Sequence, residues 1–104
     1  MTMQDSISVA ANAVSANVLA GQLYEFVGAG QLVTLSATGS ATGLRITMIC
    51  GAPLINDQAL SFQNRFCILP DDVMMSTQVP GGRMVLTFRN TSVGALTAFW
   101  RIDL

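Results

Sequence analysis

Residues that could carry out chemistry are few in this chain. It has no histidine and no lysine, so the usual general base, the imidazole metal ligand and the Schiff-base amine are all missing. Asp71 and Asp72 form the only adjacent acidic pair. Neighbouring carboxylates point apart in a strand, and in a turn they cap backbone amides more often than they bind calcium. The sequence therefore predicts that the protein is not an enzyme, has no small-molecule substrate and needs no metal or other cofactor.

The two cysteines, Cys50 and Cys67, lie in the apolar runs RITMIC and NRFCIL. They lack the CxxC spacing and the partner histidines that a zinc site would require. Free cysteines in apolar surroundings usually behave as small buried hydrophobic residues. We expect two buried free thiols, with a disulfide between them as the alternative.

Two other short motifs predict little chemistry. The glycine-rich stretch at residues 28–43 lacks the Walker pattern and a following helix, which argues against a phosphate-binding loop. The tripeptide at residues 90–92, Asn-Thr-Ser, matches the glycosylation sequon. Such sequons arise by chance, and no basic residue precedes Arg45 as a secretory signal would require.

Charge is unusually scarce in this chain. Charged residues make up 11% of it and hydrophobic residues 51%, whereas soluble domains average about 25% charged. The mean hydropathy is +0.51. Monomeric domains usually cover themselves with charge, and this chain has too few ionised groups to do so. The composition favours a subunit whose faces are covered by neighbouring copies.

Every basic residue is an arginine: Arg45, Arg65, Arg83, Arg89 and Arg101. Arginine suits fixed pairs with carboxylates or carbonyls, and lysine suits a mobile wet surface, although codon bias explains such a set equally well. The net charge is −1 and there is no basic arm. We therefore expect no direct binding of nucleic acid.

The hydrophobic pattern predicts strands about every ten residues, separated by glycine and polar turns, and almost no helix. Expected strands lie at 21–27, 31–39, 44–50, 59–69 (one or two short ones), 83–90 and 95–104. Residues 70–82 are expected to form a long connection, in which Pro70, Asp71 and Asp72 open a single helical turn. The predicted fold is all-β, an antiparallel β-sandwich of jelly-roll-like type, with an immunoglobulin-like sandwich or a small barrel as alternatives.

The first sixteen residues differ from the rest in having Asp5 as their only charge. Apolar residues fall on alternate positions, and the polar residues between them rule out the roughly 18 consecutive apolar residues of a membrane span. The sequence predicts an extended N-terminal arm at 1–16 and a β-sandwich domain at 17–104. Such an arm would aggregate if it were left open, so we expect it to lie on its own sheet or on a neighbouring subunit.

The clearest predicted hairpin joins residues 83–90 to residues 95–104. One face of it reads as core: Met84, Leu86 and Phe88 on the first strand, with Leu96, Ala98, Trp100, Ile102 and Leu104 on the second. The other face would carry Arg83, Arg89, Phe99, Arg101 and Asp103. Arginine and aromatic residues are enriched at protein–protein contacts. We predict that these five residues form an interface, with an ordinary solvated sheet face as the alternative.

In style, the chain resembles the small β-sandwich coat, cement and decoration proteins of bacterial viruses. The likeness rests on the small-residue leading segment SISVAANAVSANVLAG, the glycine-punctuated strands and the closing stretch RMVLTFRNTSVGALTAFWRIDL. The resemblance implies a self-assembling structural protein of the virion that forms trimers or pentamers and has other shell proteins as partners. Without a basic arm, such a subunit would lie outside the shell or leave genome contacts to other regions.

A second hypothesis is a carbohydrate- or receptor-binding β-sandwich module. Sugar sites present aromatic platforms beside hydrogen-bonding groups. Tyr24, Phe99 and Trp100 are the available aromatic candidates, and the strand pattern assigns Trp100 to the core. A monomer retained on a glycan array would favour this module, whereas a closed oligomer or particle would favour the structural subunit.

Overall fold

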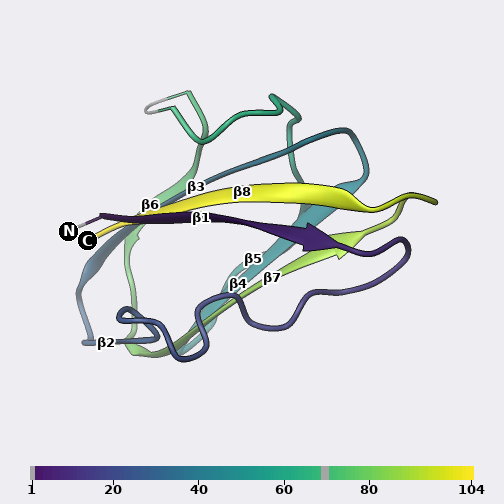
Figure 1. The fold of residues 1–104 in the computed structure, drawn as a ribbon. Coiled ribbons are helices and arrows are strands. Elements are labelled where there is room, and N and C mark those ends of the chain that lie inside the picture. The colour runs from purple at the N-terminus through teal and green to yellow at the C-terminus, as the bar shows by residue number, and fades with distance from the viewer. Residues whose placement is uncertain (1, 69–70) are drawn as a thin grey trace.

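The protein folds as eight β-strands with no helix in the part of the chain that the computed structural model describes, residues 2–68 and 71–104. The strands are β1 (Thr2–Val9), β2 (Phe26–Val27), β3 (Leu32–Gly39), β4 (Leu44–Cys50), β5 (Pro53–Ala59), β6 (Val73–Gln78), β7 (Gly82–Asn90) and β8 (Leu96–Asp103). Figure 1 shows them as two layers, with β1 and β8 side by side.

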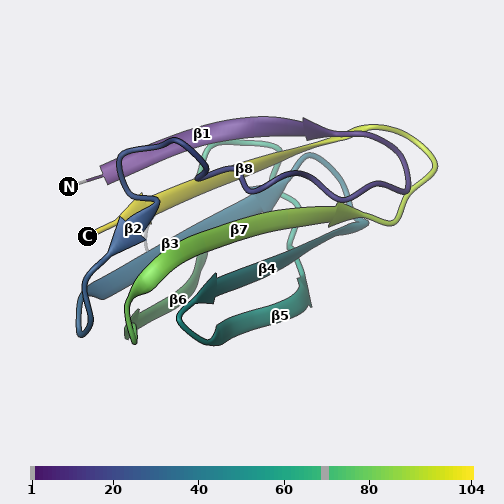
Figure 2. The ribbon, with the colours of Figure 1, turned by 90° about the horizontal axis from the view of Figure 1, so that it is seen from below.

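Each layer is a four-stranded antiparallel sheet. The first sheet has the order β1-β8-β3-β6 and the second has the order β2-β7-β4-β5 (Figure 2). The prediction of an all-β antiparallel sandwich is therefore confirmed. The pairs β1–β8, β2–β7, β3–β6 and β4–β5 join each strand of the first half of the chain to its counterpart counted from the end. The chain is thus arranged as a long antiparallel ribbon, and β8–β3 and β7–β4 close it into two sheets.

The core lies between the sheets and is built from alternate residues of the longer strands. On β4, the predicted inward set Leu44, Ile46, Met48 and Cys50 is buried, with exposed fractions of 1% or less. The inward residues of β7 and β8 are buried in the same way: Met84, Leu86, Phe88, Ala98, Trp100 and Ile102. Period-two burial is what a sheet with one face on the core requires. The sequence pattern therefore identified the inner faces of these three strands.

The predicted hairpin between β7 and β8 is wrong. β7 pairs with β2 and β4 in one sheet, whereas β8 pairs with β1 and β3 in the other. Residues 91–95 cross from sheet to sheet instead of turning tightly back. Both strands alternate in the same way, so periodicity reports which side chains are buried but does not report which strands are neighbours.

Three other segments differ from their predicted structure. Residues 21–27 are mainly turns that contain only the two-residue β2. In residues 59–68, Ala59 ends β5 and Phe62 forms an isolated bridge to Gly39, but no further strand is present. The structure instead has β5 at Pro53–Ala59 and β6 at Val73–Gln78, where the sequence predicted a loop and a long connection. Asp71 and Asp72 lie in a turn and not in a helix, and Pro70 lies outside the described residues. These strands are at sheet edges and weakly buried, so they lack a clear alternation.

The leading segment begins with β1, which is an edge strand of the first sheet. All eight of its residues pair with β8, from Thr2 opposite Asp103 to Val9 opposite Leu96. Val9 is buried in the core. Asp5 lies opposite Trp100, and its carboxylate accepts a hydrogen bond from the Ser6 amide. A charge on an edge strand discourages pairing with further strands, which explains how such an apolar segment avoids aggregation.

Residues 13–18 then run along β7 as an irregular strand. Side chains replace the backbone acceptors of a regular ladder: Ser15 Oγ accepts from the Phe88 amide and Asn17 Oδ1 accepts from the Leu86 amide. Backbone bonds from Ser15 to Phe88 and from Val18 to Leu86 complete the contact. Residues 2–16 therefore lie against the two sheets of their own chain, which is the first of the two placements that the sequence analysis allowed.

Candidate functional site

The five residues of the predicted interface do not share one surface. Arg83 and Arg89 lie on β7 and face outward from the second sheet, whereas Phe99, Arg101 and Asp103 lie on β8 and face outward from the first. The core separates the two groups. Because β7 and β8 belong to opposite layers, the five residues do not form the single contact face that the predicted hairpin implied.

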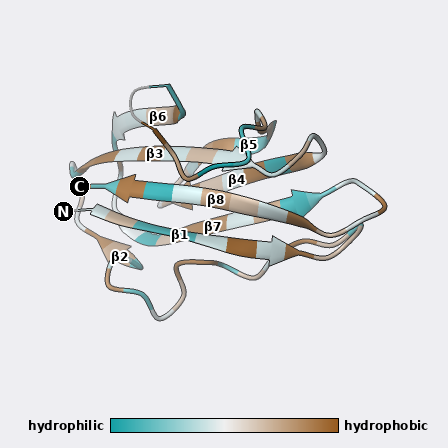
Figure 3. Cartoon of the chain, turned by 45° about the horizontal axis from the view of Figure 1, so that its top comes forward, coloured by the Kyte–Doolittle hydropathy of each residue, from teal (hydrophilic) through white to brown (hydrophobic). Residues whose placement is uncertain are grey.

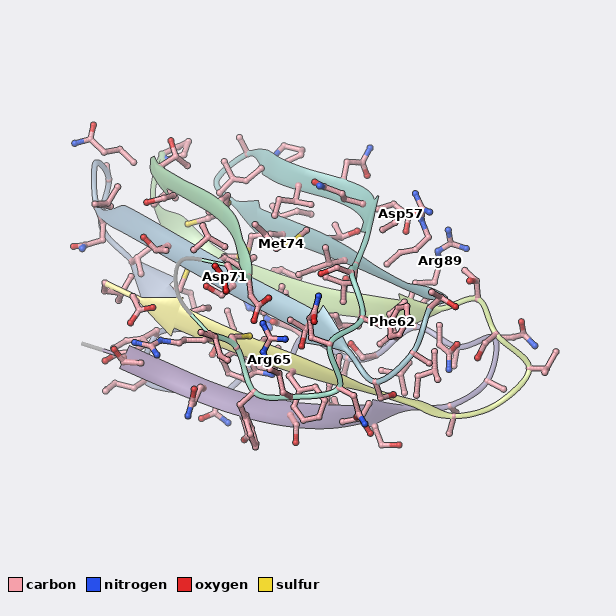
Figure 4. The ribbon with its side chains drawn as sticks, turned by 90° about the horizontal axis from the view of Figure 1, so that it is seen from above. Asp57, Phe62, Arg65, Asp71, Met74 and Arg89 are labelled. Atoms are coloured by element: carbon pink, nitrogen blue, oxygen red, sulfur yellow. The ribbon has the colours of Figure 1, made fainter. Side chains whose placement is uncertain are left out.

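Arg89 belongs to a cluster on the second sheet, centred on the carboxylate of Asp57. Arg89 donates from Nε and Nη2 to its two oxygens, at 3.1 and 2.6 Å. Arg45 lies opposite Arg89 and brings its Nε to 3.1 Å from Asp57 Oδ2, an ion-pair contact without hydrogen-bond geometry. Figure 4 shows Asp57 and Arg89 at the same end of the molecule. Hydrogen bonds from Arg89, and then the charges of both arginines, lower the pKa of Asp57.

The remaining pairs follow the same pattern. They are Arg83 with Glu25, Arg101 with Asp103 and Arg65 with Asp72. The pKa of Glu25 is lowered first by the Gly21 amide and then by Arg83. Every arginine thus has a carboxylate partner, as the all-arginine composition suggested.

In the connection between β5 and β6, the described residues 60–68 and 71–72 lie across the outer face of the first sheet. The connection joins the edge of β3 where the Gly39 amide donates to the Ser61 carbonyl, and again where the Ala37 amide donates to the Asp72 carbonyl. Between these points Thr38 Oγ1 donates to the Arg65 carbonyl. Figure 4 shows Arg65 where the connection passes over β3 and β8. The predicted surface around Phe99 and Arg101 is therefore half-covered by the chain itself.

An ion pair between the buried Asp72 and the partly exposed Arg65 joins two parts of the connection. Asp72 is 5% exposed and accepts hydrogen bonds from Arg65 Nη2, at 3.2–3.3 Å, and from the Ile68 amide, at 2.8 Å. The predicted role of this acidic residue, to bind backbone amides in a turn, is what the structure has. Beneath the connection, Ser36 Oγ is buried without a hydrogen-bond partner.

The outward surface of the connection is rich in exposed apolar side chains. Phe62, Phe66, Ile68 and the adjoining Val73 are 55%, 51%, 50% and 36% exposed. We call these four residues the connection patch. Phe66 stacks edge-on against Phe99, with ring centroids 5.1 Å apart. Along the connection, Figure 3 shows strongly hydrophobic and strongly hydrophilic stretches. Sequence reasoning missed this surface, because it assigned Phe62, Phe66 and Ile68 to short strands at 59–69 and Val73 to the long connection at 70–82.

The aromatic residues proposed for a sugar platform are differently placed. Tyr24 and Trp100 are buried in the core, and Phe99 is half-buried under Phe66. The part of the chain that the structure describes encloses no pocket, and its cysteine and carboxylate side chains form no group that could hold a metal ion.

Asn90, the acceptor residue of the glycosylation sequon, is buried. Asn90 is 1% exposed, and its Nδ2 donates to the carbonyls of Val9 and Gly94. Its Oδ1 accepts from the amide and the hydroxyl of Ser92. The side chain that would carry a glycan is thus fully engaged in the folded protein.

Cys50 and Cys67 are free and buried, which confirms the prediction of two buried thiols. Burial, followed by the charge of Asp72, raises the pKa of Cys67 to about 11, and burial raises the pKa of Cys50.

Because the thiolate is the reactive form, both cysteines should react slowly with a thiol reagent in the folded protein. We expect the rate with DTNB at pH 8 to be roughly 100-fold lower than in urea, given the scarcity of thiolate and the burial of both groups. Stopped-flow absorbance measures it. Rapid reaction of one thiol in the native state would contradict the burial of that residue.

A search of protein-family models finds no match to this chain, and comparisons with curated proteins and with solved structures likewise find none. Among the described residues, no helix has the length and apolar character to span a membrane. Inference about function therefore depends on the chain's own fold and surface.

Proposed function

We propose that this protein is a non-enzymatic structural subunit that self-assembles, as a capsid coat, cement or decoration protein of a virion. Its partners are copies of itself, in trimers or pentamers, and other shell proteins. Direct contacts with nucleic acid, a membrane or a small-molecule substrate form no part of this function.

The strand order supports a jelly-roll assignment for the sandwich. A jelly roll is an antiparallel ribbon rolled into two sheets, so that the first strand pairs with the eighth, the second with the seventh and so on inward. The pairs β1–β8, β2–β7, β3–β6 and β4–β5 follow this rule. Jelly rolls occur in viral capsid proteins and also in lectins and cupins. The fold alone is therefore compatible with both a shell subunit and a binding module.

The surface favours the shell subunit, and the connection patch is the observation that carries this choice. Phe62, Phe66, Ile68 and Val73 are exposed on one short segment, and concentrated exposed apolar surface marks sites of protein association. A sugar-binding module would instead need an aromatic platform beside a depression, and the buried Tyr24 and Trp100 supply neither.

Size in solution tests the proposal. We expect the purified protein to form a closed oligomer or particle in native mass spectrometry and light scattering. The double substitution Phe66→Asp and Ile68→Asp should weaken this assembly at least tenfold, because it places charge on the apolar contact. The β-rich circular dichroism should persist, since both side chains are half-exposed.

Val93→Asp serves as the matched control. Val93 is 94% exposed in the connection between β7 and β8, outside the connection patch. We expect this variant to assemble like the wild type. A wild-type protein that stays monomeric at high concentration would overturn the proposed function. Equal assembly of the wild type and all variants would show that the connection patch is not a contact between subunits.

A further inference from the structure

A two-sheet sandwich has four sheet edges, and here the edges are not equally protected against pairing with another strand. β1 and β6 bound the first sheet, and β2 and β5 bound the second. Exposed edges recruit further strands unless charges, short length, proline or bulges prevent it. The four edges differ in how many of these protective features they carry.

Three of the edges carry such protection. β1 has Asp5, whose carboxylate binds the Ser6 amide. β2 is two residues long. β5 begins with Pro53, contains Asp57 in the left-handed region at φ 49°, and shifts register twice against β4.

The edge of β6 differs from the other three. Its sequence, VMMSTQ, has no charged residue and no proline. Its one irregularity is at Met74, where the register against β3 slips between the pairs Leu35–Met75 and Ser36–Val73. From Met75 to Gln78 the strand pairs regularly.

The hydrogen bonds of Val79, the residue that follows β6, show which way the amide and carbonyl groups of β6 point. The Val79 amide donates to the Gln31 carbonyl, and the Val79 carbonyl accepts from the Gly30 amide, so both groups of this residue face β3. Backbone groups alternate in direction along an antiparallel strand. The amides of Gln78 and Ser76 therefore face away from the sheet, toward the open edge.

We propose that β6 pairs antiparallel with β6 of a second copy of this chain. The first sheets of the two copies then form one continuous eight-stranded sheet. Gln78 of each copy exchanges hydrogen bonds with Ser76 of the other, and Thr77 faces Thr77 across a two-fold axis. This inference rests on the proposed self-assembly and specifies one of its contacts. In a shell of trimers or pentamers it is the two-fold contact between them.

The centre at Thr77 follows from the limits of the regular segment. Pairing centred there uses residues 75–79 of both copies and stops at the irregular Met74 on one side and at Pro80 on the other. Shifting the centre to Ser76 would place Met74 opposite Gln78 and include the irregularity. The register centred on Thr77 therefore gives the longest pairing that avoids both Met74 and Pro80.

The absence of charge on β6 explains why its partner can be a copy of the same strand. β6 carries no charge, so no like charges meet and no ion must be desolvated when two copies pair. Two Ser76–Gln78 pairs supply only four interstrand hydrogen bonds, against the roughly ten of a standard interface. Additional apolar contact is required, and Val73 and Leu32, which are 36% and 53% exposed, lie beside the edge.

A charge-exchange experiment tests the pairing. Thr77 is on the same face of the first sheet as its partner Val33, but it is exposed because β6 is the edge strand. A long charged residue at this position can therefore extend past the edge into solvent. We expect Thr77→Lys alone and Thr77→Glu alone each to abolish the two-fold contact, because like charges face one another. An equimolar mixture of the two variants should restore it. Native mass spectrometry measures the assembled fraction, with Ser8→Lys on the guarded edge of β1 as the control.

A cross-link tests the same contact independently of charge. Opposed residues in the narrow antiparallel pair have Cα atoms about 4.5 Å apart, within disulfide range. We expect Thr77→Cys, treated with diamide as the oxidant, to give a covalent dimer on a non-reducing gel, and Ser8→Cys to give none.

The two levels of the hypothesis fail in different ways. A wild-type protein that is monomeric throughout would overturn both the proposed function and the β6 contact. A wild-type assembly that persists in Thr77→Lys and yields no Thr77→Cys dimer would overturn the β6 contact alone. Protection of the Ser76 and Gln78 amides from hydrogen exchange, lost in Thr77→Lys, would support it.

Discussion

Replacing Asn90 by alanine is expected to lower the free energy of unfolding by about 3 kcal/mol, because buried partners lose their hydrogen bonds together. The carbonyls of Val9 and Gly94 lose a donor, and the amide and hydroxyl of Ser92 lose an acceptor. Asn90 itself is 1% exposed. Equilibrium unfolding in urea, followed by tryptophan fluorescence, measures the loss.

Two further variants sharpen this prediction. Asn56→Ala, at an exposed position on β5, should change stability by no more than about 0.5 kcal/mol. Asn90→Asp keeps the acceptor for Ser92 but turns a carboxylate toward the carbonyls of Val9 and Gly94. It should be at least as destabilising at pH 7, with partial recovery under mild acid, where the carboxyl is protonated. Equal stability of Asn90→Ala and Asn56→Ala would contradict the role of Asn90.

Deleting residues 1–16 is expected to abolish cooperative folding. The deletion removes β1 together with the buried Val9, so that the whole edge of β8 and the core residues that Val9 covers are exposed. It also removes Ser15, whose hydroxyl is the acceptor for the Phe88 amide on β7. Both sheets therefore lose a neighbour at once. Circular dichroism and thermal melting measure the effect, and we expect no sharp transition and a largely insoluble product.

A shorter deletion separates the folding role from a role in assembly. Removing residues 1–4 shortens β1 but leaves Val9 and Ser15 in place, so this variant should fold with a lowered melting temperature. A native-like melting curve for the longer deletion would show that the segment is dispensable for folding. It would then belong to contacts between subunits.

The paired arginines explain how a surface with little charge is organised. Asp57 has a lowered pKa because Arg89 and then Arg45 favour its ionised form. A lowered carboxyl pKa contributes stability above the pKa of the unfolded chain, and this contribution is lost as the pH falls through the folded value. These groups are solvent-exposed, so their role lies more in fixing the outer face of the second sheet than in stability.

The class of fold and the inward faces of the longest strands could be predicted from the sequence alone. Alternation in residues 44–50, 83–90 and 95–104 identified the buried residues, because a side chain on a strand must point either to the core or away from it. The buried state of both cysteines followed from their apolar neighbours. Pairing of arginine with carboxylate was one of two explanations for the absence of lysine, and the five ion pairs support it.

The neighbours of each strand are known from the tertiary structure and not from the sequence. The candidate site depends on these neighbours, because they set which side chains share a surface. Arg89 and Phe99 have the outward character that the sequence assigned to them, yet they lie on opposite layers, because the chain crosses between sheets after β7. The connection patch and the open edge of β6 arise from long-range placement of short, irregular segments. Local pattern specifies the face a side chain takes, whereas non-local hydrogen bonding between strands distant in sequence specifies what lies beside it.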